Sequence, residues 1–402
     1  MINNCSQTFL VVPKLIEQTT WGGSYILNNK NWYEKKDFQG LKIGQSYELF
    51  SGSMLRDDID SSADSTFTGQ LGYGMQPNKI FYQGDEQKLI SLNHLIKQNP
   101  QRILGTKAVK AFGAEMKILV KFTQAKGNSF QMHVQQKDHS SKWRFKPESW
   151  YFFEKGLTTL GVKKQTNWND YQNCCLSIEK EIQDIGKKIQ DKVISISSAK
   201  EQIEEIIKKY NPWQYVNLVK VKKDELIDLS KGGIHHSWEK NSAEYPNGNI
   251  LYEVQLDVMD PTSTIRCFDK GKIGEDGSTR KLNIDDYFKY IDRSDKNNDP
   301  MNHLTKSKIL LENNDATIIS LQHTEHYSLD KMMIRSNYSG SHTSTMGSFH
   351  HLFVKVGKVV VESKSSKLEL TKGHSCFIPA GVEQYSIQTK GNEIAEVLKT
   401  FI

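Results

Sequence analysis

Most of the chain alternates short apolar runs with polar breaks, which is the pattern of short β-strands. Aromatic and β-branched residues dominate the runs 117–122, 150–153, 216–221, 250–257 and 352–361. No strand–helix–strand rhythm connects them, so a doubly wound parallel sheet is disfavoured. The pattern predicts a mainly β protein with antiparallel barrels or sandwiches.

Residues 170–210 depart from the strand pattern. Isoleucines recur here three and four positions apart, as on one face of a helix. They are Ile178, Ile182, Ile185, Ile189, Ile203, Ile206 and Ile207. We predict two amphipathic helices, inserted into a β-domain and packed on it. A partner-binding or membrane-surface helix is the alternative, but charges of both signs cover the polar face.

The composition changes again at residues 297–306, where polar residues interrupt the strand pattern. We predict a linker here, followed by a separate small β-domain. The predicted segments are the first part of the larger domain (1–156), the helical insertion (157–213), the second part of the larger domain (214–300) and the small domain (313–402). Each β-region contains a turn phrase of the same length, which ends at His235 in the first and at Gln384 in the second.

The composition narrows the class of protein. Lys and Arg number 53 against 47 Asp and Glu, which gives a net charge of +6, and 37% of the residues are hydrophobic. These values exclude disordered and collagen-like chains. No apolar run approaches about eighteen residues, and the first residues lack the basic and apolar segments of a signal peptide. We therefore expect a cytoplasmic protein that binds no membrane.

The charge pattern and the cysteines bear on partners and compartment. The lysines are interspersed with acidic residues, so the one-sided basic surface of a nucleic-acid-binding protein is not expected. A modest positive excess suits an anionic small substrate equally well. The five cysteines show no Cys-x-x-Cys spacing and are expected to be reduced thiols.

Four polar residues have the composition of a metal site. Gln131 and His133 lie two apart at the end of a predicted strand and so project from one face. Glu148 precedes an aromatic strand, and His235 follows a Gly-Gly turn. Two imidazoles, a carboxylate and an amide oxygen suit a divalent metal, with zinc favoured if the coordination is tetrahedral. Each residue alone is more often structural, so the prediction depends on their combination.

Further polar residues adjoin this group. Lys146 shares a face with Glu148, and Glu253 lies on the polar face of the strand 250–257. Arg266 suits bidentate capture of a phosphate, or a surface ion pair with a neighbouring aspartate. The C-terminal region adds His323, His326, His342, His350 and His351. We predict no second metal site there, because neighbouring histidines on one strand face opposite ways.

These motifs resemble type I mannose-6-phosphate isomerase, a zinc enzyme of the cupin superfamily. The likeness runs over most of the chain, with agreement in order and relative spacing. The matching stretches are 21–23, 42–49, 118–122, 129–133, 146–148, 232–235, 253–255 and Arg266. The resemblance implies two cupin (jelly-roll) barrels, a catalytic one and a smaller C-terminal one. It implies a small sugar phosphate as substrate, and we expect a monomer or a weak homo-oligomer.

The resemblance also implies an activity and a role for each residue. The activity is interconversion of mannose 6-phosphate and fructose 6-phosphate, an aldose–ketose isomerisation through an enediol. The implied ligands of one Zn²⁺ per chain are Gln131, His133, Glu148 and His235. The implied catalytic residues are Arg266, Lys146 and Glu253. The substrate-binding candidates are Trp21, Ser129 and Lys137. Glu253, His133 and Asp260 are candidates for the group that transfers the proton.

The sequence departs from the family pattern at three places. Val134 replaces a proline, Lys270 replaces an aromatic residue, and Thr262 stands where an aspartate is usual. Two other functions therefore stay open. Two histidines and a carboxylate also bind iron in Fe(II) dioxygenases of the cupin class. A non-catalytic cupin that binds a sugar phosphate is the other alternative.

Overall fold

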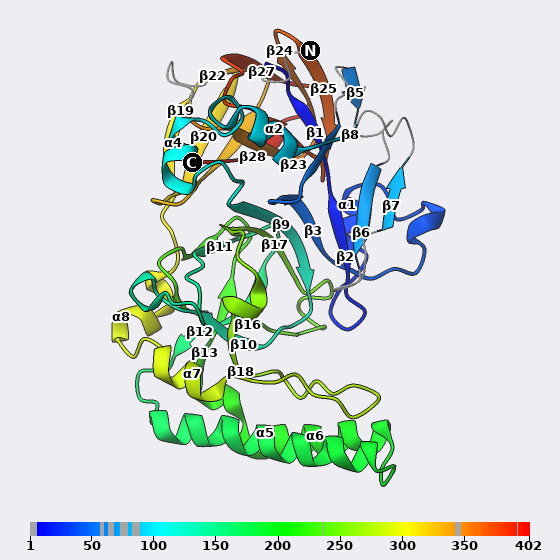
Figure 1. The fold of residues 1–402 in the computed structure, drawn as a ribbon, viewed down its shortest axis with the longest axis vertical. Helices are drawn as coiled ribbons and strands as arrows, with labels where there is room; N and C mark the ends of the chain where they lie inside the picture. The colour runs from blue at the N-terminus through cyan, green and yellow to red at the C-terminus, as the bar shows by residue number, and fades with distance from the viewer. Residues whose placement is uncertain are drawn as a thin grey trace.

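The computed structural model describes residues 6–56, 60–62, 68–72, 79–82, 89–235, 237–341, 347–391 and 393–402. Two β-rich bodies follow one another along the long axis of the molecule, and a helical hairpin lies at one end (Figure 1). Strand pairing within the sheets is almost entirely antiparallel. The predicted mainly β fold, with jelly-roll barrels and a helical insertion, is confirmed.

The residues predicted to bind a metal lie on two of the sheets. The first sheet has eight strands in the order β14 (Leu226–Leu229), β11 (Glu148–Phe152), β17 (Asn249–Leu256), β9 (Ile118–Ala125), β3 (Ile43–Leu49), β2 (Lys14–Glu17), β6 (Thr68–Gly72) and β7 (Lys79–Tyr82). The second has β15 (Gly233–Ile234), β10 (Phe130–His133) and β18 (Ile265–Phe268). A third, smaller sheet joins β13 (Val216–Val221), β12 (Gly156–Val162) and β16 (Ser237–Trp238). We call this body the larger barrel.

The C-terminal barrel is built from a nine-stranded and a five-stranded sheet. The order of the first is β19 (Lys308–Glu312), β20 (Ala316–His323), β21 (Ser328–Ile334), β28 (Ala395–Phe401), β23 (His350–Val356), β26 (Ser375–Ile378), β1 (Phe9–Val12), β4 (Met54–Arg56) and β8 (Leu89–Ser91). The order of the second is β22 (Asn337–Ser341), β27 (Gln384–Thr389), β24 (Lys358–Ser363), β25 (Ser366–Thr371) and β5 (Asp60–Ser62). Strands β1, β4, β5 and β8 thus extend the C-terminal sheets with N-terminal residues.

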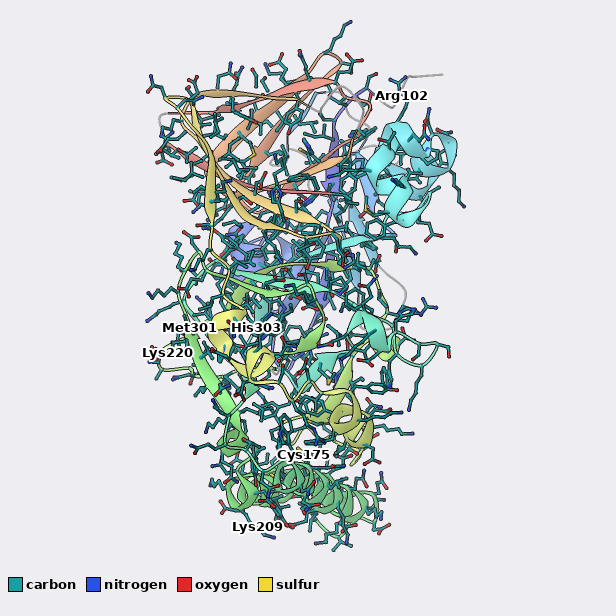
Figure 2. All side chains as sticks on the ribbon, turned by 90° about the vertical axis from the view of Figure 1, so that its left-hand side faces the viewer. Arg102, Cys175, Lys209, Lys220, Met301 and His303 are labelled. Atoms are coloured by element: carbon teal, nitrogen blue, oxygen red, sulfur yellow. The ribbon has the colours of Figure 1, made fainter. Side chains whose placement is uncertain are left out.

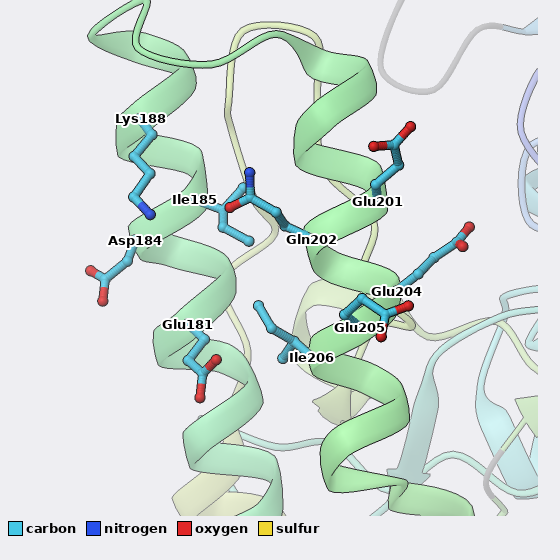
Figure 3. Close-up of a pocket in the computed structure, with 9 residues that line it drawn as sticks. All are labelled: Glu181, Asp184, Ile185, Lys188, Glu201, Gln202, Glu204, Glu205 and Ile206. Carbon is cyan, nitrogen blue, oxygen red and sulfur yellow. The ribbon is translucent and has the colours of Figure 1, made fainter.

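Two long helices form the hairpin, α5 (Trp168–Gln190) and α6 (Ile196–Tyr210). Asn167 and Ser195 cap their N-termini through side-chain hydrogen bonds to backbone N–H groups. The predicted isoleucine face is buried or partly buried against β18 and the helix α7 (Ile284–Tyr290). Charged residues of both signs occupy the outer surface, where Glu181, Lys188 and their neighbours line a furrow of about 590 Å³ between the helices (Figure 3).

The remaining helices are short. They are α1 (Tyr25–Asn29), α2 (Leu92–Gln98), α3 (Pro100–Leu104), α4 (Thr106–Phe112) and α8 (Asp295–Asn298). Among the described residues, no helix is long and apolar enough to cross a membrane. Cys174, Cys175, Cys267 and Cys376 are buried free thiols, whereas Cys5 lies outside the described residues.

The stretch predicted as a linker packs on the larger barrel. Asn298 accepts a hydrogen bond from the Val162 backbone through its side-chain oxygen, at 2.9 Å. His303, labelled in Figure 2, is only 8% exposed. Its ring nitrogens lie 3.1 Å and 2.9 Å from the carbonyl oxygens of Asp228 and Asn297. The segment therefore fixes the approach of the chain to the C-terminal barrel.

Aromatic residues join the two barrels. Phe122 and Tyr252 from the larger barrel pack on Phe353 of β23, with ring centroids 5.4 Å and 5.3 Å apart. All three side chains are fully buried in one hydrophobic cluster. This shared core holds the sheet that carries the site residues against the C-terminal barrel.

Candidate metal centre and active site

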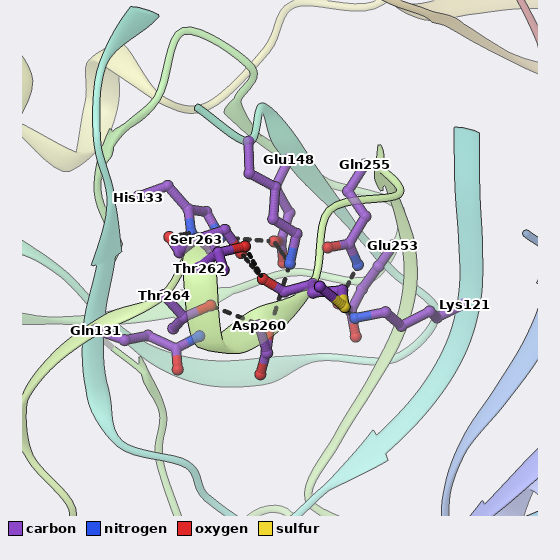
Figure 4. Close-up of polar contacts among 12 residues, drawn as sticks. Lys121, Gln131, His133, Glu148, Glu253, Gln255, Asp260, Thr262, Ser263 and Thr264 are labelled. Atoms are coloured by element: carbon purple, nitrogen blue, oxygen red, sulfur yellow. Dashed lines mark hydrogen bonds and ion pairs between the residues drawn. The ribbon is translucent and has the colours of Figure 1, made fainter. Parts of the chain in front are cut away.

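Three of the four predicted metal ligands converge in the larger barrel. His133 ends β10 and Glu148 begins β11 (Figure 4). His235 follows β15. Their ligand atoms all lie within 4.8 Å of one another, and all three residues are buried. This is the only such group of three among the described His, Cys, Asp and Glu residues.

A glycine turn brings His235 back beside His133. Gly233 pairs with His133 across β10 and β15, and Gly232 has φ +69°, a conformation that favours glycine. A Cβ on Gly232 would lie 2.6 Å from the Val134 carbonyl oxygen, so a side chain does not fit there. The His235 ring then packs against His133 at 4.6 Å and edge-on against Trp150 at 5.1 Å.

The hydrogen bonds of His133 identify a position for a cation. Its Nδ1–H donates to the Ser263 carbonyl at 2.7 Å, which leaves the Nε2 lone pair directed at Glu148 Oε2, 3.1 Å away. Burial lowers the pKa of His133, and the charge of Lys146 lowers it further, so the ring is neutral. A lone pair that faces a carboxylate oxygen is stabilised by a metal ion bound to both.

Glu148 is held in its ionised form. Burial opposes ionisation, but the charge of Lys146 outweighs it and keeps the pKa of Glu148 well below its usual range. Trp150 Nε1–H donates to Oε1 at 2.5 Å, and Lys146 Nζ lies 3.6 Å from Oε2. A neutral imidazole and a fixed carboxylate are the protonation states that bind a divalent metal.

Gln131 completes the group. Its amide nitrogen lies 3.3 Å from His235 Nε2, while Ser129 Oγ donates to its amide oxygen at 3.1 Å. Exchanging the two ends of the amide directs the oxygen at the His235 side and keeps a bond to Ser129, because a hydroxyl also accepts. The four side chains therefore offer two imidazoles, a carboxylate and an amide oxygen, which are donor types of a four-coordinate metal site.

Glu253 lies beside this group on the same sheet. It stands between Trp150 and Lys121 in the register of β11, β17 and β9, and its side chain is 1% exposed. Thr123 Oγ1–H donates to Oε1, and Lys121 Nζ lies 3.6 Å from Oε2. Burial raises the pKa of Glu253 to about 7. The residue can therefore take up and release a proton near neutral pH.

Arg266 faces the same region from β18, directly opposite Gln131. Its Nε–H donates to Ser129 Oγ at 3.2 Å, and its Nη2 pairs with Asp260 Oδ2 at 3.0 Å. Lys146 Nζ lies 3.6 Å from the other oxygen of Asp260. Asp260 thus forms ion pairs with both Arg266 and Lys146. Thr262 instead donates a hydrogen bond to the Met259 carbonyl.

Two predicted substrate-binding residues lie farther out. Trp21 is partly buried at the bend before α1, in contact with the hydrophobic cluster around Trp150. Lys137 lies in a 3-10 turn and is exposed, and no ion pair joins it to the site among the described residues. Lys270, noted as a departure from the family, donates hydrogen bonds to Glu239 and the Trp238 carbonyl.

Sequence reasoning missed the residues that support Glu253. Lys121 and Thr123 lie within a β-strand whose side chains are otherwise almost all apolar. A charged residue inside a buried strand was the available signal, since such a residue needs a partner. Ser263, whose carbonyl orients His133, acts through its backbone and gave no side-chain signal.

The C-terminal histidines lie apart from this centre. His350 Nδ1 bonds the Tyr385 hydroxyl at 2.7 Å, and His351 Nδ1 bonds the Tyr252 hydroxyl at 3.3 Å. His323 and His326 are adjacent to Asp330 and Glu325 respectively. His342 lies outside the described residues.

The fold matches that of known isomerases. Residues 317–397 match the family model described as "Mannose-6-phosphate isomerase, cupin domain". The mannose 6-phosphate isomerase of Bacillus subtilis is 14% identical, over 99% of this chain and 100% of its own, with a TM-score of 0.64. The Salmonella typhimurium enzyme, solved with fructose 6-phosphate and zinc, is 12% identical over 98% and 99%, with a TM-score of 0.61. No curated protein sequence matches the chain. The resemblance is thereby confirmed for the fold.

Proposed function

We propose that this protein is a zinc-dependent isomerase that interconverts mannose 6-phosphate and fructose 6-phosphate. The observation that carries the proposal is the convergence of His133, Glu148 and His235 beside a buried carboxylate, Glu253. The fold shared with mannose 6-phosphate isomerases supports it. Gln131 and the three converging residues would hold the metal, which when bound supplies a Lewis acid that polarises a substrate oxygen.

Glu253 is the group suited to transfer the proton. The isomerisation removes the C2 proton of the open-chain aldose and returns a proton to C1 of the enediol, while the proton of the C2 hydroxyl moves to the C1 oxygen and leaves C2 as the ketone. An ionised Glu253 accepts the first proton, and its protonated form delivers one to C1. A pKa of about 7 makes both forms available at neutral pH. The fixed positions of Lys121 and Thr123 orient the carboxylate.

Cations at the other end of the site are suited to hold the phosphate. Arg266 and Ser129 lie next to Gln131. Lys272 and Arg280 both approach the carboxylate of Asp269, at 3.8 Å and 3.5 Å. A phosphate bound by these cations would fix the distant end of the sugar and so place C1 and C2 at Glu253 and the metal ligands. Lys146 would stabilise negative charge that develops on the substrate oxygens.

A coupled isomerase assay with metal analysis of the same sample tests the proposal. Purified protein should convert mannose 6-phosphate and contain about one zinc per chain. Glu253→Gln should abolish conversion and retain the metal, whereas Glu115→Gln, at an exposed position, should behave as the wild type. Full activity of Glu253→Gln would contradict the assigned role. Bound iron with oxygen consumption would instead favour the dioxygenase function.

A further inference from the structure

The loop after β18 carries two of the cations that face Arg266. It leaves the strand at Asp269 and returns at Asn283, whose N–H donates to the Arg266 carbonyl at 2.8 Å. Burial lowers the pKa of Lys272, and the positive charges of Arg280 and Arg266 lower it further. Lys272 and Arg280 pair with the buried carboxylate of Asp269, and Arg266 pairs with Asp260. Three cations thus face two carboxylates, which leaves an excess of positive charge for an anionic ligand.

The helical hairpin lies directly against this loop. A groove of about 710 Å³ separates α6 from residues 269–280, and its lining includes Lys200, Lys272 and Arg280. Figure 1 shows this loop in yellow-green, where it runs alongside α6. Helix α5 also packs on the back of β18 through Cys267 and Phe268. The hairpin therefore contacts both the strand that carries Arg266 and the loop that follows it.

Two glycines make the contact between loop and hairpin possible. Gly271 has φ +73°, and a Cβ there would lie 2.5 Å from Ile203 and 2.7 Å from Ile207 of α6. Gly277 has φ +79° and lies against the backbone of Gly186 in α5. At Gly277 the two backbones approach closer than a side chain allows, and at Gly271 the loop backbone packs on the ends of two isoleucine side chains. Gly271 and Gly277 flank residues 272–276, which begin with Lys272. Because both glycines contact the hairpin, the hairpin fixes the position of this segment.

We propose that the α5–α6 hairpin is a positioning element for phosphate binding, which acts through Gly271 to place Lys272 and Arg280 beside Arg266. The inference rests on the proposed function, in that the anion is the phosphate of the substrate. Gly271 itself does not contact the substrate. It permits the loop to lie where Lys272 and Arg280 bind the same phosphate as Arg266. The helical insertion thereby serves selection of a phosphorylated sugar over a neutral one.

The decisive variant is Gly271→Ala, with Gly113→Ala as its control. Gly113 has nearly the same backbone angle, φ +76°, but no atom within 4 Å of its added Cβ. Both variants therefore carry the strain of alanine at positive φ, and only the first has the clash. We expect KM for mannose 6-phosphate to rise about tenfold in Gly271→Ala, with kcat within about twofold and metal content unchanged. Gly113→Ala should keep the wild-type KM.

A second variant separates position from stability. Adding Ile203→Ala and Ile207→Ala to Gly271→Ala removes the atoms that the new Cβ would meet. The melting temperature should fall further, because Ile203 is buried. KM should nevertheless return most of the way to the wild-type value. A KM that worsens in step with the melting temperature would overturn the proposal.

Calorimetric titration with inorganic phosphate distinguishes this proposal from the proposed function. If the wild type turns over no mannose 6-phosphate, the proposed function fails, and the titration alone decides the present inference. Wild-type and Gly113→Ala protein should bind phosphate about tenfold more tightly than Gly271→Ala. Equal affinities for the two glycine variants, or no binding to the wild type, would overturn it.

Discussion

The larger barrel and the C-terminal barrel share an antiparallel architecture and a turn phrase of equal length, yet they use their histidines differently. In the larger barrel the phrase ends at His235, which is fully buried next to His133. In the C-terminal barrel it ends at Gln384, which begins β27 and is exposed. The comparison shows that a metal centre needs ligands from facing strands that converge, and that the number of histidines is a poor guide.

The interiors of the two barrels explain the difference. In the C-terminal barrel, apolar residues such as Leu352, Val361 and Ile387 fill the interior. Of its buried histidines, His350 and His351 contact tyrosine hydroxyls and His374 contacts Thr371. In the larger barrel, the interior face of the eight-stranded sheet carries Glu148 and Glu253 across from β10. Burying two carboxylates is unfavourable unless cations compensate them, which is the energetic reason for Lys121 and Lys146.

The largest expected effect comes from removing one converging ligand. His235→Ala should reduce the zinc content from about one per chain to less than about a tenth, and activity about a thousandfold or more. His323→Ala changes a histidine of the C-terminal barrel whose side chain is 48% exposed, and it should alter neither. Metal analysis and the coupled assay on both variants measure this. Full metal retention in His235→Ala would remove that residue from the site.

The next effect concerns the phosphate. Arg266→Ala should lower kcat/KM about a hundredfold, on the order of 3 kcal/mol, because a charge-assisted pair and the positioning of the substrate are lost. Arg266→Lys should recover only part, since an ammonium lacks the planar fork of donors. Arg335→Ala, which removes an arginine that bonds Thr317 in the C-terminal barrel, is the control. Wild-type kinetics in Arg266→Ala would end the assignment.

A smaller effect is expected in the pH profile. Glu253 must be ionised to accept the C2 proton, and burial raises its pKa to about 7, so kcat/KM should fall as the pH drops below 7. The charge of Lys121 lowers the pKa of Glu253. Lys121→Met should therefore move the acidic limb upward by about one pH unit. Lys331→Met, in the C-terminal barrel, should leave the profile unchanged. A downward shift in Lys121→Met would contradict this assignment.

Much of this organisation could be predicted from the sequence, where local pattern decides the structure. The isoleucine spacing identified α5 and α6 because one helical face packs on β18. Three of the candidate ligands could be proposed from the sequence because His133 ends a strand, Glu148 begins one and His235 follows a glycine turn. Arg266 pairs with Asp260, which is the kind of ion pair that the sequence offered as the alternative to phosphate capture.

The hydrophobic pattern does not show which strands pair when they lie far apart in the sequence. Strand β1 looks like any apolar strand, and nothing local indicates that Leu10 pairs with Cys376, more than three hundred residues away. The pairing of the N-terminal strands with the C-terminal sheets therefore could not be predicted from local pattern. The contact between the loop after β18 and the hairpin could not be predicted for a similar reason. Nothing local in the sequence indicates that Gly271 lies against Ile203.

The smallest expected effect sharpens the comparison of the two turn phrases. Gln384→His gives the C-terminal phrase the residue that ends the first one, and we expect no second metal ion. Position 384 is exposed, His350 is bound to Tyr385, and His351 contacts Tyr252 on the opposite side of β23. No carboxylate completes a group of three there among the described residues. Metal analysis should give about one zinc per chain in Gln384→His and almost none when His235→Ala is added. A second equivalent of zinc that stays bound when His235→Ala is added would show that the turn phrase alone suffices to form a metal site.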